Sequence, residues 1–200
     1  MKLRRALRSL FKLNHKLNML ITPLKIPEIF IIKPHTFEDL RGEISEVFRL
    51  DLFKERIGLK ANFVQDNQVR SSCGVLRGLH YQLPPYAQGK FVIVVQGKIF
   101  DVVVDLRKSS PTFGKYISQI LSAENKKKIW IPEGFAHGFI TLSKTSNVIY
   151  KLTNYHNIRY ERCILWNDED LKIKWPKCEK IILSNKDLLG LSMNNAEKFP

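Results

Sequence analysis

The sequence has 200 residues and a mass of 23.3 kDa, a length that fits one domain with its own hydrophobic core. With 44% hydrophobic and 26% charged residues, the composition is that of a folded globular chain and excludes disorder over most of it. The three cysteines are odd in number and lack Cys-x-x-Cys spacing, and no secretory segment is recognisable. We therefore expect neither a disulfide framework nor a thiolate zinc site, and we predict a reducing, cytoplasmic location.

The net charge of +14 is distributed unevenly. Residues 1–27 contain seven lysine or arginine residues and no acidic residue, so this segment holds half of the net positive charge. Apolar residues recur there every three or four positions up to Pro23, which predicts a basic amphipathic helix in an extension spanning residues 1–25. Such a helix can contact an anionic membrane surface or bind nucleic acid, and a tail without either role is the competing interpretation. No long uncharged apolar run supports a membrane-spanning helix.

From Ile26 onward, short apolar or alternating segments recur about every ten residues, with turn-forming residues between them. This spacing predicts an all-β sandwich or barrel of antiparallel strands. Helical patterns in this part of the chain are limited to residues 51–57 and 185–191. Residues 26–200 are therefore expected to form one β domain with a C-terminal segment that covers it.

Residues 91–96 and 99–106 form the clearest strand pair in the pattern, and we expect a hairpin in which Gly97 supplies a positive φ. In the second strand, side chains alternate between two faces. We expect the face that contains Val102 to be core, which leaves Asp101 facing either a cavity or solvent.

The segment 75–85 carries Arg77 and His80, which fall on opposite faces of a strand unless a bulge intervenes. Gly78 is a residue type that permits such a bulge. An imidazole with an ordinary pKa near 6.5 is mostly neutral at pH 7 and can accept a proton. On its own, His80 is more typical of a structural histidine.

Residues 132–137 read Pro-x-Gly-x-x-His, a pattern similar to the second half of the cupin signature. Metal-binding cupins supply a His-x-His pair and a glutamate from the first half, whereas this chain has His80 followed by Tyr81 and Gln82. His80 and His137 without a clustered carboxylate make a poor transition-metal site. We therefore predict no bound metal.

Other candidates carry little signal by themselves. Tyr150 lies in an apolar strand, where a tyrosine is usually part of the core. Six polar residues on or beside strands are typical of solvated surface when each is taken alone: Arg41, Glu46, Gln65, Asp66, Asn67 and Lys90.

Several long motifs, taken together, identify a family. They occur in the order 63–67, 74–90, 100–114, 121–125 and 130–139. From about Ile26 to Asp187 the chain closely resembles the dTDP-4-dehydrorhamnose 3,5-epimerase family. The resemblance implies a metal-free cupin jelly roll, usually a homodimer, that works without a cofactor. It also implies that dTDP-4-keto-6-deoxyglucose is the substrate, inverted at carbons 3 and 5 on the way to dTDP-L-rhamnose.

The resemblance also implies roles for individual residues. His80 matches the base that removes the protons, Tyr150 matches the acid that returns one on the opposite face, and Asp187 resembles the partner of the histidine. Lys90 matches a lysine near the keto oxygen. In such dimers, the residues corresponding to Arg41 and Glu46 reach into the neighbouring site. Residues at substrate-binding positions of the family are Arg41, Glu46, Gln65, Asp66, Asn67, Arg77, His137, Glu161 and Lys186.

The chain departs from the family pattern in three places. Glu43 and Ser45 stand where relatives generally have bulky apolar residues, and His156 stands where an aromatic residue is common. The basic extension has no counterpart in the family.

Three alternatives stay open. An enzyme on the same scaffold could invert only one carbon, and His80 and Tyr150 do not decide this, because it depends on how the intermediate turns in the site. A basic β-module could bind nucleic acid, but no strand face alternates basic and aromatic residues, so we expect no such partner. A metal-dependent cupin oxygenase is the third alternative.

Overall fold

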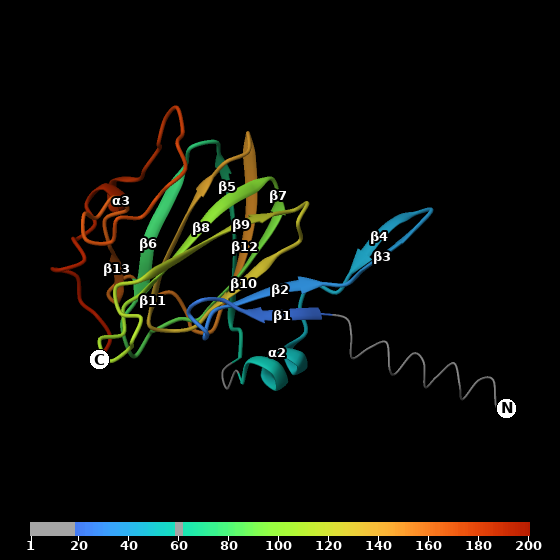
Figure 1. Ribbon diagram of the computed structural model, residues 1–200, viewed down its shortest axis with the longest axis horizontal. Helices are drawn as coiled ribbons and strands as arrows, with labels where there is room; N and C mark the ends of the chain where they lie inside the picture. The colour runs from blue at the N-terminus through green and yellow to red at the C-terminus, as the bar shows by residue number, and fades with distance from the viewer. Residues whose placement is uncertain (1–18, 59–61) are drawn as a thin grey trace.

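The computed structural model describes residues 19–58 and 62–200, and its antiparallel strands form two sheets that face each other (Figure 1). The six-stranded sheet has the order β1 (Met19–Pro23), β2 (Phe30–Pro34), β10 (Lys128–Ile131), β7 (Lys90–Gln96), β12 (Thr145–Leu152), β5 (Gln65–Ser72). The five-stranded sheet has the order β13 (Glu161–Cys163), β6 (Leu76–Gln82), β11 (Phe135–Thr141), β8 (Lys98–Asp105), β9 (Tyr116–Ser122).

Two short helices and a separate hairpin complete the described chain. Helix α2 spans Leu50–Ile57 and ends at Gly58, whose φ of 73° is the left-handed cap for which glycine is preferred. Helix α3 spans Asn185–Leu188. Both helices lie where the sequence predicts them, and the mostly antiparallel β architecture is also confirmed. Across residues 19–58 and 62–200, no helix combines the length and apolar character needed to cross a bilayer.

The expected hairpin of residues 91–96 and 99–106 is wrong. Strand β7 pairs with β10 and β12, whereas β8 pairs with β11 and β9, so the two strands belong to different sheets. The chain crosses between the sheets at Gly97, which has the expected positive φ of 77°. Both strands are buried over most of their length, so each is central in its sheet and takes partners that are distant in sequence.

The expectation that the Val102 face of β8 is core is confirmed, but the opposite face is core as well. Ile99 and Val103, which share a face with Asp101, belong to the core between the sheets. Val102, on the other face, is equally buried because the C-terminal segment packs over it with Leu171, Met193 and Phe199. Asp101 therefore faces the interior between the two sheets, where it is only 1% exposed.

Residues Met19–Pro23 form strand β1 and pair with β2, so the helix prediction is wrong for this part of the extension. Met19 and Ile21 pack against the aromatic cluster around Phe53, while Leu20 between them is exposed. This two-residue alternation is that of a strand, and the backbone of the strand pairs with the edge of β2. The local sequence does not specify this partner. The remainder of the predicted helix, residues 1–18, lies outside the described residues.

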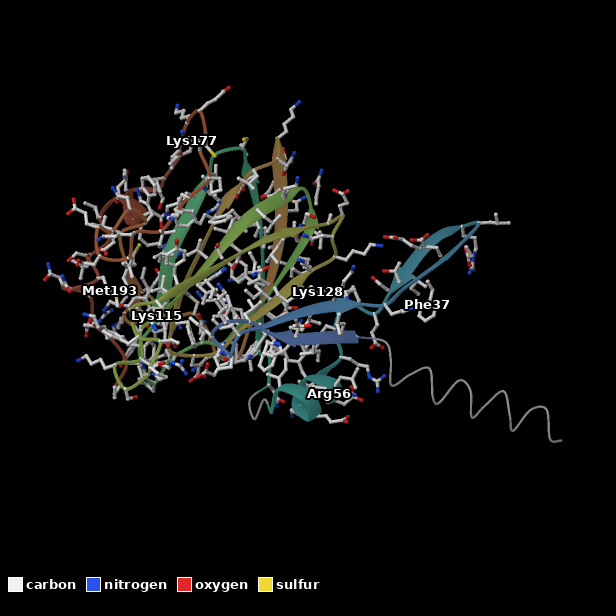
Figure 2. The ribbon with its side chains drawn as sticks, viewed as in Figure 1. Phe37, Arg56, Lys115, Lys128, Lys177 and Met193 are labelled. Atoms are coloured by element: carbon white, nitrogen blue, oxygen red, sulfur yellow. The ribbon has the colours of Figure 1, made fainter. Side chains whose placement is uncertain are left out.

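Strand β3 (Thr36–Asp39) and strand β4 (Gly42–Ser45) form a two-stranded hairpin that extends away from the body of the domain (Figure 1). Its apolar side chains Phe37, Leu40 and Ile44 are exposed, and Figure 2 shows Phe37 well away from the two sheets. A hairpin with this much exposed apolar surface is typical of a protein interaction site.

A β-bulge in β6 controls the position of two predicted site residues. His137 pairs with His80 and Phe139 pairs with Arg77, so two residues of β6 oppose Gly138 alone. The bulge reverses the alternation between positions 77 and 80. Arg77 and His80 consequently line the same cavity, as the bulge at Gly78 requires.

Gly78→Ala is expected to disrupt this bulge and destabilise the fold. Gly78 has a φ of 114°, and a Cβ there would lie 2.7 Å from both the Gly138 Cα and the His137 carbonyl oxygen. Gly42 has a φ of 122°, but a Cβ at that position would meet no atom within 4 Å, so Gly42→Ala isolates the backbone strain. Because overpacking adds to the strain, we expect Gly78→Ala to lower the free energy of unfolding by about 2 kcal/mol more than Gly42→Ala. Urea unfolding measures this difference, and equal losses would contradict it.

Candidate active site

A cavity of about 450 Å³ lies between the two sheets and opens to solvent. Strands from both sheets contribute to its wall, so residues distant in sequence meet there. The predicted site residues that line it are Gln65, Asn67, Arg77, His80, Lys90, His137, Tyr150, Glu161 and Lys186.

His80 forms a hydrogen-bonded pair with Asp187. The His80 Nε2 atom lies 2.6 Å from Asp187 Oδ1, which also accepts from the Gly78 backbone amide at 3.1 Å. Ser184 Oγ donates to the other carboxylate oxygen at 2.7 Å. Helix α3 thus places Asp187 against β6. When the Nε2–H group of His80 donates to this carboxylate, the Nδ1 atom keeps a lone pair that can accept a proton.

The electrostatics of this pair favour a neutral imidazole beside a carboxylate. Burial lowers the pKa of His80 below its ordinary value of 6.5, although the hydrogen bond to Asp187 works in the opposite direction. Burial alone would raise the pKa of Asp187, but the hydrogen bonds from His80 and Ser184 hold it at about 2. At pH 7 His80 is therefore mostly neutral and able to accept a proton.

Asp187 is expected to make the stability of the fold depend on pH. Because its folded pKa of about 2 lies below the ordinary 3.8, its stabilising contribution is complete at about pH 5 and is lost as the pH falls towards 2. Between about pH 5 and pH 2, the wild type should lose about 2 kcal/mol more free energy of unfolding than Asp187→Asn. Denaturant titrations at both pH values measure the difference, and parallel losses would show that the carboxylate does not carry it.

Lys90 brings a buried cation to the same wall. Its Nζ atom donates to the His80 backbone carbonyl at 2.9 Å, and the residue is only 9% exposed. Burial lowers the pKa of Lys90 to about 8, with Glu161 and Asp101 as the nearby acids that oppose this shift. The ammonium group is therefore mostly charged at neutral pH, beside the histidine.

A second histidine–carboxylate pair lies next to the first. His137 is the register partner of His80 on β11, and its Nε2 atom is 2.8 Å from Asp101 Oδ2. Asp101 Oδ1 is buried and has no hydrogen-bond partner within the described residues. The sequence did not decide whether Asp101 faces a cavity or solvent. The alternation of β8 identifies the face on which Asp101 lies, but not what covers that face.

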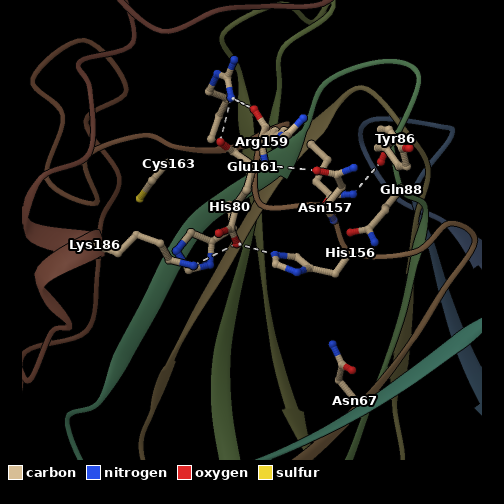
Figure 3. A network of polar contacts seen from close by, with 12 residues as sticks. Asn67, His80, Tyr86, Gln88, His156, Asn157, Arg159, Glu161, Cys163 and Lys186 are labelled. Carbon is tan, nitrogen blue, oxygen red and sulfur yellow. Dashed lines mark hydrogen bonds and ion pairs between the residues drawn. The ribbon is translucent and has the colours of Figure 1, made fainter.

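Glu161, Lys186 and His156 form a polar network at the rim (Figure 3). Lys186 Nζ donates to Glu161 Oε1 at 2.9 Å, and His156 Nε2 lies 3.6 Å from the same oxygen. Burial tends to raise the pKa of Glu161, but the hydrogen bond from Lys186 lowers it below its ordinary value. In the sequence, His156 stood out only as a departure from the family pattern, and no signal pointed to Gln88, which also lines the cavity.

Tyr150 approaches the cavity from the sheet opposite His80. It lies on β12 of the six-stranded sheet, whereas His80 lies on β6 of the five-stranded sheet. The two side chains therefore line the same space from opposite walls. A molecule bound between the sheets would have an imidazole on one side and a phenol on the other.

Apart from Asp187, which acts on the cavity only through His80, three predicted site residues do not reach this cavity within the chain. Gln65 and Asn67 line the cavity, so strand alternation turns Asp66 to the outer face, where its carboxylate contacts Lys151 Nζ at 2.7 Å. Arg41 lies at the hairpin tip and pairs with Asp39, and Glu46 follows the hairpin. Because Asp66 lies on the outer face of the sheet, it cannot contact a molecule bound in this cavity.

The jelly-roll sandwich and its cavity, with two histidine–carboxylate pairs and a facing tyrosine, define a cupin-type protein. A family model described as dTDP-4-dehydrorhamnose 3,5-epimerase matches residues 23–195. The chain belongs to this family and is an epimerase. The resemblance carried by the long motifs is thereby confirmed.

Individual relatives agree with the family match. The dTDP-4-dehydrorhamnose 3,5-epimerase of Shigella flexneri is 50% identical over 90% of this chain and 99% of its own length. The crystal structure of dTDP-6-deoxy-D-glucose-3,5-epimerase from Legionella pneumophila in complex with dTDP-4-keto-L-rhamnose has a TM-score of 0.87 and 45% identity, covering 90% of this chain and 95% of that one. A 3′-monoepimerase from Streptomyces bikiniensis, in complex with dTDP-quinovose, has a TM-score of 0.82 and 31% identity, covering 86% and 87% of the two chains.

Proposed function

We propose that this protein binds dTDP-4-keto-6-deoxyglucose between its sheets and inverts carbons 3 and 5 by removing and returning protons, in the biosynthesis of dTDP-L-rhamnose. The observation that carries the proposal is the position of His80 and Tyr150 on opposite walls of one cavity. Inversion requires a proton to leave one face of the ring and return to the other, so it needs a base and an acid on opposite sides. The double reaction also accords with the 50% identical Shigella flexneri relative.

His80 is the proposed base. A proton beside a ketone becomes removable when the negative charge that develops on the oxygen is stabilised, and the buried ammonium of Lys90 is the proposed donor for this purpose. Asp187, at 2.6 Å from the imidazole, holds one tautomer and stabilises the imidazolium that forms. A neutral imidazole needs no further activation for this step.

Tyr150 is the proposed acid. A phenol is protonated at neutral pH, so it can deliver a proton to the enolate from the wall opposite the base. Arg77 lines the cavity with its Nε atom bound to Ser71 Oγ at 3.1 Å, which leaves its terminal nitrogens for an anion. Guanidinium groups bind phosphate oxygens in a forked geometry, so Arg77 is the proposed contact for the diphosphate.

The second candidate is epimerisation at one carbon only, which the similarity to the Streptomyces bikiniensis 3′-monoepimerase supports. Incubation with dTDP-4-keto-6-deoxyglucose in D₂O separates the two, because each carbon that loses its proton acquires deuterium. The double epimerase should label carbons 3 and 5, whereas label at carbon 3 alone would establish the second candidate. Absence of label at both carbons would refute the proposed function.

The proposed assembly is a homodimer in which the β3–β4 hairpin packs on the partner. Exposed Leu40 and Ile44 on the hairpin and exposed Val95 on the outer face of the six-stranded sheet provide apolar surface for it. Arg41 at the hairpin tip is then available to the partner's cavity. We retain the prediction of a cytoplasmic location, which the three free cysteines support.

Mixed dimers test whether Arg41 acts in the partner's site. We expect Arg41→Ala and His80→Asn to be nearly inactive when each is produced alone. When the two are co-expressed, half of the dimers are mixed and each mixed dimer has one intact site, so about a quarter of wild-type turnover should return. No recovery in purified mixed dimers would contradict a shared site.

A further inference from the structure

A thiol that the proposed mechanism does not use lies beside the His80–Asp187 pair. Cys163 on β13 is the register partner of His80 on β6, and its Sγ atom lies 4.0 Å from Asp187 Oδ1. One ligand atom from each of the three residues lies within 4.8 Å of the others, and no second group of this kind occurs in residues 19–58 and 62–200. Figure 3 shows Cys163 and His80 near Lys186 and Glu161.

The three ligand atoms are nitrogen, sulfur and oxygen, the set that Zn²⁺ takes in proteins. Tetrahedral zinc with bonds of about 2.0 to 2.3 Å places its ligand atoms about 3.3 to 3.6 Å apart. The His80 Nε2 to Asp187 Oδ1 distance of 2.6 Å would have to widen by less than about 1 Å, and the Sγ to Oδ1 distance of 4.0 Å would have to shorten by about 0.5 Å. Side-chain rotations supply shifts of this size.

We propose that His80, Cys163 and Asp187 form an inhibitory site for a thiophilic divalent cation, with Zn²⁺ as the ion. Binding moves the Nε2 proton of His80 to Nδ1 and releases the thiol proton to solvent, so the thiolate and the carboxylate together neutralise the ion. The three residues leave a fourth position for water, as in other zinc sites with three protein ligands.

The charges around the site set its strength and its pH dependence. Glu161 favours a cation there, whereas Lys186 and Lys90 oppose it. Because metal binding displaces the thiol proton of Cys163, zinc affinity should increase with pH over the neutral range.

Inhibition rests on the proposed function, because it follows from the role of His80 as base. A metal bound to Nε2 and to Asp187 separates the pair that positions the imidazole and fixes its tautomer. Removal of Cys163 should weaken the metal site but leave turnover intact, because Cys163 has no part in the proposed reaction. This separates an inhibitory metal from a catalytic one.

The test uses the full-length wild type, Cys163→Ala and a control, Cys178→Ala, which changes a thiol that does not belong to the His80, Cys163 and Asp187 group. Zinc should inhibit wild type and Cys178→Ala at the same concentration, with recovery on adding EDTA. Cys163→Ala should need at least about 10- to 100-fold more zinc for the same inhibition, since loss of a residue that only supports a ligand already costs that much. Equal sensitivity of Cys163→Ala and wild type would overturn the site.

Cobalt binding provides a readout that does not depend on turnover. Co²⁺ added to wild-type protein should give a near-ultraviolet thiolate-to-cobalt absorption band, which Zn²⁺ abolishes and Cys163→Ala lacks. The band is measured without substrate, so its presence would support the site even if the protein had no epimerase activity. A wild-type spectrum without this band would overturn the proposal.

Discussion

Replacing His80 with asparagine should nearly abolish both turnover and the exchange of substrate protons for deuterium. A positioned base contributes about 100- to 10,000-fold to a proton transfer, and asparagine cannot accept the proton. Asparagine is polar and smaller than histidine, and Asp187 keeps its hydrogen bonds from the Gly78 amide and Ser184 Oγ, so the fold and the cavity should be retained. Nuclear magnetic resonance in D₂O follows exchange directly, and the binding of dTDP checks that the variant is intact.

His137→Asn is the matched comparison for this experiment. His137 is the register partner of His80, lines the same cavity and has its own carboxylate, Asp101. It is therefore the residue that could take the role of base in place of His80. We expect His137→Asn to keep measurable exchange at both carbons. If exchange persisted in His80→Asn and disappeared in His137→Asn, the base would be His137.

Tyr150→Phe should uncouple exchange from inversion. The variant retains His80, Lys90 and Asp187, so protons should still leave the ring and deuterium should still return from the His80 side. Without the hydroxyl, delivery from the opposite face should slow by about 100- to 10,000-fold. The expected result is labelled substrate with unchanged configuration, together with very little inverted product.

Tyr155→Phe controls for the loss of a tyrosine hydroxyl in the same region. Tyr155 is 62% exposed, so this change should leave both exchange and inversion near their wild-type rates. Chromatographic separation of the epimers, combined with mass measurement, reports both processes in one sample. Equal loss of exchange in Tyr150→Phe and His80→Asn would contradict the division of roles between the two walls.

Local sequence signals were sufficient where the physical cause is also local. The apolar spacing of residues 51–57 predicted helix α2 because the periodicity of a helix is contained within its own residues. Gly78 indicated only where a bulge was permitted, because the freedom to adopt a positive φ is a property of that one residue, and the bulge that forms there places Arg77 and His80 in the same cavity. The roles of the site residues were predicted from long motifs that resemble a family, because a single histidine or tyrosine carries little signal by itself.

Strand pairing was the part that local patterns predicted wrongly. Gly97 has the expected φ, but the two strands that it joins entered different sheets. Each strand is apolar on both sides, so many partners are compatible with it, and the choice depends on how all strands bury their surfaces together. The strand Met19–Pro23 shows the same effect, because its partner β2 supplies hydrogen bonds that a helix would otherwise make internally.

The sequence alone determined that the chain is an antiparallel β protein with short helices, and its long motifs identified the family. These conclusions need only the order and type of residues. The tertiary structure decided that Asp101 faces the interior, that Asp66 faces outward and that Cys163 lies beside the His80–Asp187 pair. Those three positions depend on which strands become neighbours and on what covers each face, and non-local packing sets both.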